Sequence, residues 1–301
     1  MKILVTANQK GGVGKSTLTA HLAYAAHEDG KRVLMVDMDR QGSLSMTFPS
    51  TGGHGIVASQ LYLPALPADA AIEMVDEGLG IVRADAALLE VDRAENSVVK
   101  RPRAALQQFA DQFDLCLIDT PPLLGMRLLA SLAAADYVVT PLSIGVYELA
   151  GLGDLMQTMQ ALRQKGVNQH AKHIGFLPVN TNTRSTAERD GLAMLRQRYG
   201  DAVLIEATLP SRAAVKKAVA ARKPVWHSTQ GGGHLAAGKE WRAAGRRGLK
   251  RGEGGGDRGR GRKPPNPPGG TSSPAPPSLG RPGRRPAVRT TKPSSFRLRW
   301  I

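Results

Sequence analysis

Eight residues near the N-terminus, 10–17, constrain the fold more strongly than any other part of this chain, and they read KGGVGKST. The apolar run 3–7 that precedes them has the composition of a buried strand, and residues 18–26 follow with apolar side chains at helical spacing. A glycine-rich loop between a strand and a helix is the context of a phosphate-binding loop. The sequence therefore predicts a nucleotide-binding site at the start of the chain.

The expected chemistry of this loop follows from its residue types. Glycines allow backbone N–H groups to turn inward around a phosphate, and the helix N-terminus adds a partial positive charge. Lys15 is placed to contact the β- and γ-phosphates, and the Ser16 hydroxyl is placed to ligate Mg²⁺. Glycine-rich turns flanked by lysines also occur without a ligand, but the flanking strand and helix favour the nucleotide site. The predicted nucleotide contacts are Gly11, Gly12, Val13, Gly14, Lys15, Ser16 and Thr17.

Carboxylates end two further predicted strands. The run 32–39 ends with Asp37 and Asp39, and the run 113–119 ends with Asp119. The carboxyl ends of parallel strands meet at the ligand crevice of an open α/β sheet, so we expect these acids beside the phosphates. Asp119 suits a role in holding the shell of a magnesium ion through water. Strand-end acids also begin turns without any further role, but three of them together with the loop favour a phosphoryl-transfer site.

The loop departs from the general phosphate-binding pattern in two places, because Gln9 stands where a first glycine is usual and Lys10 adds a second lysine. This form resembles the deviant Walker A motif of the ParA/MinD family of dimeric ATPases. The resemblance implies that Lys10 crosses a dimer interface to the phosphates of the partner subunit, and that Asp39 positions the attacking water. The residues that it implies for catalysis are Lys10, Lys15 and Asp39. Those that it implies for the metal are Ser16, Asp37 and Asp119.

Further segments resemble those of short plasmid ParA proteins. The run 209–218 followed by KPV at 223–225 is similar to the C-terminal segment of that family, and 141–152 to its central strand-to-helix turn. Arg40 stands where the family usually has proline, at a position that shapes a turn and carries no chemistry. The resemblance covers about residues 1–242 and implies no N-terminal DNA-binding extension, because the loop begins at residue 10.

The apolar runs alternate between strand and helix patterns, which predicts an α/β fold with a mostly parallel, doubly wound sheet covered by helices on both faces. This is the fold expected of a P-loop NTPase of the deviant Walker A type. The predicted strands are 2–7, 33–37, 79–83, 114–119, 136–141, 173–179 and 203–207. The predicted helices are 15–29, 99–112, 124–134, 147–166, 185–199 and 211–221.

Charge divides the chain near residue 242. Residues 1–242 hold 26 Lys and Arg against 23 Asp and Glu, whereas 243–301 hold 15 against 2, together with 12 glycines and 10 prolines. We therefore expect an ATPase domain at 1–242 and a basic, disordered Gly/Arg/Pro-rich tail at 243–301. The run 239–244 is interpreted as the start of a last helix, whose periodicity is then lost. Such a tail can bind nucleic acid through phosphate contacts, or it can be an inert product of a shifted reading frame.

The resemblance implies an ATP- and Mg²⁺-dependent partition ATPase. It implies a homodimer that forms on ATP, binds DNA non-specifically and is released when a ParB-like partner stimulates hydrolysis. The expected DNA contacts are Arg184, Arg212, Lys216 and Lys217, although each also suits a solvated surface.

Two other classes stay open. One is a MinD-like switch that positions a membrane or protein cargo, and the other is an ATPase that serves a metabolic enzyme, such as the cobyrinate-type amidases. The sequence shows no run of about 18 apolar residues. We therefore expect a cytoplasmic, nucleoid-associated protein without stable membrane insertion.

Overall fold

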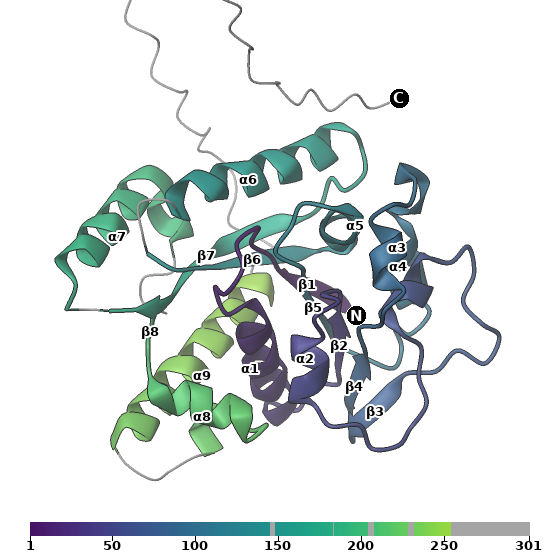
Figure 1. The fold of residues 1–301 in the computed structure, drawn as a ribbon, viewed down its shortest axis with the longest axis horizontal. Coiled ribbons are helices and arrows are strands. Elements are labelled where there is room, and N and C mark those ends of the chain that lie inside the picture. Colours follow the sequence, from purple (N-terminus) through teal and green to yellow (C-terminus); the bar gives the residue numbers. More distant parts are fainter. Residues whose placement is uncertain (145–147, 183, 204–207, 228–231, 254–301) are drawn as a thin grey trace, which may run out of the picture. The chain divides into compact units, whose positions relative to one another are not determined.

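The computed structural model describes residues 1–144, 148–182, 184–203, 208–227 and 232–253. Within these residues eight strands form one sheet in the order β3-β4-β2-β5-β1-β6-β7-β8 (Figure 1). All neighbouring pairs are parallel except β3 and β4, which form an antiparallel hairpin at one edge. The strands are β1 (Lys2–Thr6), β2 (Val33–Asp37), β3 (Glu73–Asp76), β4 (Leu79–Val82), β5 (Leu115–Asp119), β6 (Tyr137–Leu142), β7 (Lys172–Thr181) and β8 (Leu209–Pro210).

Helices cover both faces of the sheet, which confirms the predicted doubly wound α/β fold. Figure 1 shows α1, α8 and α9 together on one side and α6 and α7 on the other. The α-helices are α1 (Lys15–Glu28), α2 (Ser43–Thr47), α3 (Leu88–Val91), α4 (Arg101–Gln107), α5 (Met126–Ala134), α6 (Glu148–Gln164), α7 (Thr186–Tyr199), α8 (Ala213–Ala220) and α9 (Gly232–Glu253). Short 3-10 turns are η1 (Ala58–Tyr62), η2 (Asn96–Val98), η3 (Gly200–Ala202) and η5 (Val225–His227).

The central strands are buried on both faces because their side chains alternate between two apolar layers. In β1, Ile3 and Val5 pack in the layer under α3, α4, α5 and α6, whereas Leu4 packs in the layer under α1, α2, α8 and α9. The same alternation in β5 buries the lone cysteine, Cys116, in the first layer. Continuous apolar runs in the sequence are therefore the direct consequence of a sheet covered on both sides.

The structure differs from the predicted elements at the two ends of the sheet. The hairpin strand β3 was not predicted, and the predicted strand 203–207 falls largely on 204–207, outside the described residues. Val203 itself forms an isolated bridge with Phe176, and the last strand of the sheet, β8, comes later in the chain. The unpredicted strand β3 carries the charged residues Glu73 and Asp76, which hide its periodicity.

The last helix differs most from its expected position. The expected start at 239 is wrong, because α9 begins at Gly232 and continues to Glu253. Residues 243–253 therefore belong to a helix rather than to a disordered tail, while 254–301 lie outside the described residues. Ala237, Trp241 and Ala244 lie four and three residues apart and are buried against the layer that includes α1. This spacing places the three side chains on one apolar face of the helix. That face continues past residue 242, where the sequence predicted the boundary of the domain.

Candidate nucleotide-binding site

The glycine-rich loop joins β1 to α1 at the centre of the sheet. Gly12 and Gly14 have φ angles of 72° and 79°, in the left-handed region where a side chain would be strained. A Cβ at either glycine would meet no atom within 4 Å, so backbone conformation and not crowding requires glycine there. No side chain of the described residues caps the start of α1 at Lys15. The first N–H groups of α1 are thus left for an anion.

The two lysines of the loop lie in different environments. Lys15 is only 7% exposed, and its Nζ donates to the carbonyl oxygen of Lys10 at 3.0 Å. Burial lowers the pKa of Lys15, while the charges of Asp119 and Asp39 act in the opposite direction. The Lys10 side chain is exposed, and its backbone N–H donates to Asn8. One lysine is therefore held among the acids, and the other stands at the surface of the site.

Asp119 is a buried carboxylate that lacks a hydrogen-bond partner among the described residues. It ends β5, is 0% exposed, and neither of its side-chain oxygens accepts a hydrogen bond from any described residue. Burial, and after it the charge of Asp37, raise its pKa to about 8, although the nearby Ser16 hydroxyl and Lys15 ammonium oppose this rise. A buried charge without partners is costly. These two oxygens have the chemistry to receive a cation or a water bound to it.

Asp37 and Asp39 both contact the chain that follows β2. Asp37 Oδ2 accepts from the backbone N–H and the hydroxyl of Ser45, each at 2.8 Å, and its Oδ1 accepts from the Asp39 N–H at 3.1 Å. Burial nevertheless raises the pKa of Asp37 to about 6. Asp39 is half-buried, and its Oδ1 accepts from the Gln41 N–H at 3.1 Å. Asp37 therefore holds the start of α2, whereas the Asp39 carboxylate lies at the edge of the site.

The structure brings the expected nucleotide and metal residues together at one end of β1, β2 and β5. Thr6, Asp37 and Asp119 are in register across these three strands. Among the described residues there is no cluster of three or more His, Cys, Asp or Glu side chains that could hold a metal ion. A magnesium ion here would therefore depend on phosphate oxygens and water for most of its ligands, which is its usual mode beside nucleotides.

Comparison with known proteins agrees with this geometry. A family model described as an AAA domain matches residues 1–173. Protein IncC of Escherichia coli is 34% identical over 230 residues, which cover 75% of this chain and 63% of IncC. The chromosome-partitioning ATPase Soj of Thermus thermophilus is 34% identical over 204 residues, which cover 66% of this chain and 78% of Soj. The chain belongs to the ParA family.

Among solved structures, this ParA-family chain is similar to cobyrinic acid a,c-diamide synthase from Mycobacterium smegmatis, determined with bound ADP and magnesium. The TM-score is 0.69 at 26% identity, over 85% of this chain and 96% of that one. The likeness confirms the predicted P-loop fold. The chain spans less than two thirds of the length of IncC.

The four residues expected to contact DNA lie in two places in this ParA-family chain. Arg184 is exposed in the turn before α7. Lys216 and Lys217 are exposed on α8, on the side of the sheet that also carries α1 and α9 (Figure 1). Arg212, just before α8, is instead engaged in a two-pronged ion pair with Glu240 of α9 at 2.5 and 2.7 Å. The guanidinium of Arg212 therefore joins α8 to α9.

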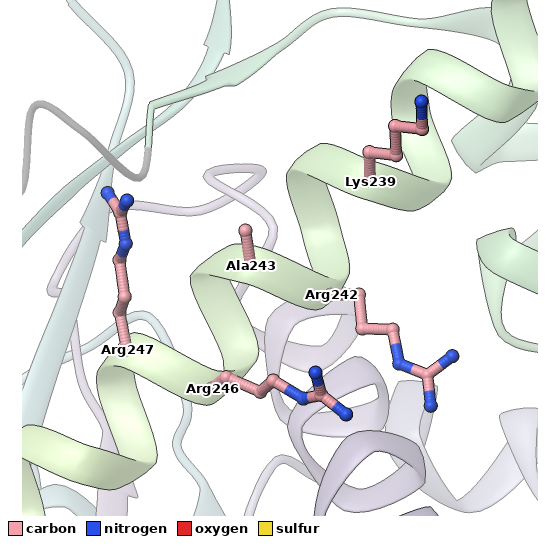
Figure 2. Close-up of a pocket in the computed structure, with 5 residues that line it drawn as sticks. All are labelled: Lys239, Arg242, Ala243, Arg246 and Arg247. Carbon is pink, nitrogen blue, oxygen red and sulfur yellow. The ribbon is translucent and has the colours of Figure 1, made fainter.

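A basic face of α9 was not predicted, because most of this helix was not. Figure 2 shows Lys239, Arg242, Arg246 and Arg247 around Ala243, where they line a shallow pocket. Arg242 pairs with Glu28 and Arg246 with Asp29, both at 3.1 Å. These two pairs fasten α9 to the end of α1. The spacing of the basic residues is the signal that was available in the sequence.

Arg83, a residue that the sequence analysis did not single out, supports α2. Arg83 Nη1 donates to the carbonyl oxygens of Ser45 and Phe48 at 2.7 and 2.8 Å, at the C-terminal end of this helix. Its other nitrogens bind Glu73 of β3 at 2.7 and 2.8 Å. The segment after Asp37 is thus held at both ends. No signal in the sequence pointed to this pair, because Glu73 belongs to the unpredicted strand.

Within the described part of the chain, no helix has the length and apolar character needed to cross a membrane.

Proposed function

We propose that this chain is a partition ATPase that binds ATP with Mg²⁺ in the loop after β1 and hydrolyses it to ADP and phosphate. The observation that carries the proposal is the convergence of Lys15 and Asp119, with Asp39 beside them, at the open start of α1. The name of Soj, a chromosome-partitioning ATPase with 34% identity, supports the same class. Partition ATPases use the nucleotide as a switch rather than as a source of chemical product.

The residues present fit ATP and magnesium. Lys15 and the N–H groups of 11–17 would hold the phosphates, and Ser16 with Asp119 would hold the metal. The observation that supports this fit is that neither oxygen of Asp119 has a hydrogen-bond partner within the described part of the chain. Magnesium, when bound, would neutralise charge on the phosphates. Asp37 would join the metal site only through water, because both of its oxygens already accept hydrogen bonds from the chain.

The catalytic roles are divided among three residues. Asp39 orients the attacking water, and its half-buried carboxylate at the edge of the site supports this role. Lys15 stabilises the charge that develops on the transferred phosphoryl group. Lys10 reaches the phosphates of a partner subunit when two copies of the chain close on ATP. Its exposed side chain beside the loop supports that assignment.

The ATP-bound dimer binds DNA non-specifically, and a ParB-like protein releases it by stimulating hydrolysis. Arg184, Lys216 and Lys217 supply phosphate contacts, and their exposure supports this role. Arg212 contributes less, because Glu240 already neutralises its charge. We place the protein in the cytoplasm on the nucleoid. The ATPase domain takes in 1–242 together with the rest of α9, and the basic tail follows.

The likeness to a protein named as a diamide synthase favours a second candidate, an ATP-dependent amide-forming enzyme. An enzyme that takes its nitrogen from glutamine commonly uses a reactive cysteine as nucleophile. The only cysteine of this sequence, Cys116, is 0% exposed in the core, and burial raises the pKa of its thiol. This chain therefore offers no accessible thiolate, and we favour the partition ATPase.

The proposal is tested by ATP binding and by what stimulates turnover. We expect Lys15→Gln to weaken Mg-ATP binding at least ~100-fold, because charge-assisted hydrogen bonds to the phosphates are lost. Far-UV circular dichroism controls for folding. Turnover of the wild type is then compared with duplex DNA, with glutamine and with anionic vesicles. Stimulation by DNA alone supports the proposal, whereas stimulation by glutamine or by vesicles would favour the synthase or a MinD-like switch.

A further inference from the structure

The peptide group that leads into Asp39 is held on both of its polar atoms. The Met38 carbonyl oxygen accepts from Arg127 Nη1 at 3.2 Å, and the Asp39 N–H donates to Asp37 Oδ1 at 3.1 Å. The preceding N–H, that of Met38, donates to the Asp119 carbonyl oxygen at 3.0 Å. A peptide unit is planar. Fixing its carbonyl and its N–H therefore fixes the direction in which the Asp39 side chain leaves the backbone.

Arg127 reaches Met38 from the first turn of α5. Its side chain is only 9% exposed, and its Nε and Nη2 donate to Asp92 Oδ2 at 2.9 and 2.6 Å. A cation in the first turn of a helix opposes the helix dipole. Asp92 offsets that cost, since its carboxylate lies at the same helix terminus, 3.4 Å from the Arg127 backbone nitrogen.

The approach of Asp92 depends on a glycine. A Cβ built at Gly125, the residue before α5, would lie 2.8 Å from Asp92 Oδ1. Gly125 therefore lets the carboxylate come close enough to hold the guanidinium from one side while Met38 accepts from the other. An arginine fork can serve two such acceptors at once, whereas the compact ammonium of lysine cannot match that geometry.

We infer that Arg127 is a positioning residue for the proposed hydrolysis, which fixes Asp39 through the Met38 carbonyl while Asp92 holds the guanidinium in place. The inference rests on the proposed function. It assigns Arg127 no contact with the nucleotide. Its loss should therefore change turnover and the backbone around Asp39 while leaving nucleotide affinity nearly unchanged.

The test compares Arg127→Lys with a matched control, Arg103→Lys. Arg103 also joins a carboxylate to a backbone carbonyl, since it donates to Asp136 Oδ1 at 3.0 Å and to the Ala134 carbonyl. That pair lies at the other end of α5, away from the loop. We expect Arg127→Lys to lower kcat about tenfold or more, as the loss of a charged hydrogen bond predicts, with Mg-ATP affinity within about threefold of the wild type. Arg103→Lys should keep kcat.

A second readout uses the nucleotide-free protein. Hydrogen exchange of the amides at 38–41 should be faster in Arg127→Lys than in the wild type, while the amides of β1 exchange at unchanged rates. Faster exchange in both segments would indicate general destabilisation and would overturn the positioning role. This measurement does not depend on ATP hydrolysis. If the wild type hydrolyses no ATP, the proposed function fails, and hydrogen exchange still decides whether Arg127 orders the backbone at Asp39.

A double variant keeps the inference testable if Arg127→Lys does not fold. Arg127→Met with Asp92→Leu removes the whole ion pair, which is commonly tolerated better than leaving one charge without its partner. We expect this variant to fold, to bind Mg-ATP and to show the same loss of kcat. Wild-type kcat in either folded variant, or a loss of kcat matched by a loss of affinity, would overturn the inference.

Discussion

Asp37 and Asp119 are Cα partners at the carboxyl ends of the neighbouring strands β2 and β5, yet their carboxylates have opposite surroundings. Asp37 accepts three hydrogen bonds from Ser45 and Asp39, whereas both oxygens of Asp119 lack a partner among the described residues. Asp37 therefore stabilises the chain around it. Asp119 is a buried acid whose charged form the neighbouring Ser16 hydroxyl and Lys15 ammonium compensate only in part.

This difference predicts that Asp119→Asn stabilises the nucleotide-free fold. The folded pKa of Asp119 is raised to about 8 from an ordinary 3.8, so its contribution to stability is complete below 3.8 and is lost as the pH rises through 8. We expect the variant to gain about 1–3 kcal/mol at pH 8.5, the cost typical of an uncompensated buried group, and to gain little near pH 4. Urea unfolding at both pH values measures this.

Asp37→Asn is the matched control for that experiment. An amide cannot accept all three hydrogen bonds, so we expect this variant to be less stable than the wild type. An Asp119→Asn protein that is destabilised to the same degree would show that Asp119 has a structural partner, and it would remove the argument for a cation at this position.

We expect the contribution of His21 to the free energy of unfolding to change with pH in the opposite direction from that of Asp119. His21 Nδ1 contacts the Thr17 carbonyl oxygen at 2.8 Å, its Nε2 accepts from the Val225 N–H at 3.3 Å, and the rings of Trp226 and Trp241 pack beside it. Burial lowers its pKa from 6.5 to about 4. The neutral ring therefore contributes stability that is present above pH 6.5 and is lost as the pH falls towards 4.

The acids titrate in the same range, so the wild type alone cannot isolate His21. We compare its unfolding free energy with that of His21→Gln at pH 7.5 and pH 4.5. The difference between the two proteins should shrink by about 2–3 kcal/mol at the lower pH, in line with a shift of this size. A difference that does not change with pH would show that His21 is not held neutral.

The extent of α9 predicts where the chain can be shortened. Ala244 is 4% exposed in the apolar layer shared with α1, and Arg246 pairs with Asp29 at 3.1 Å. A chain ended after residue 242 loses both contacts, and one ended after residue 253 keeps them. We expect the shorter chain to be less stable by about 1–2 kcal/mol, from lost apolar burial and a weak surface ion pair. Equal melting temperatures would contradict this packing of α9.

How far the sequence predicts this fold depends on whether the determining contacts are local. Local sequence patterns were enough to predict the loop, β1, β2, β5 and α1, because a continuous apolar run or a glycine motif marks each of them within a few residues. Strand β3 was not, because Glu73 is buried only through its pairing with Arg83 of the neighbouring strand segment. The start of helix α9 was predicted too late in the chain, because its Gly- and Arg-rich sequence hides the buried face at Ala237 and Trp241.

The same distinction applies to the candidate site. Lys15 and Asp119 were predictable from motifs that place them at the ends of strands and loops. The contact of Arg127 with Met38 joins residues 89 positions apart, and the pairing of Arg212 with Glu240 crosses between two helices. No local pattern encodes either. The sequence therefore predicted the groups expected to contact the nucleotide, and it missed the contacts that Arg127 and Arg212 make with distant parts of the chain.

The nucleotide switch is the central claim, and one measurement tests it most directly. Asp39→Ala should bind Mg-ATP but hydrolyse little of it, which holds the protein in its ATP-bound form. Analytical ultracentrifugation of this variant with fluorescent duplex DNA is run with ATP, with ADP and without nucleotide. The double variant Lys10→Ala, Asp39→Ala serves as the control that binds ATP but cannot close the dimer. We predict dimers on DNA only for Asp39→Ala with ATP. DNA binding that is equal under all three conditions, or equal in the control, would contradict the account.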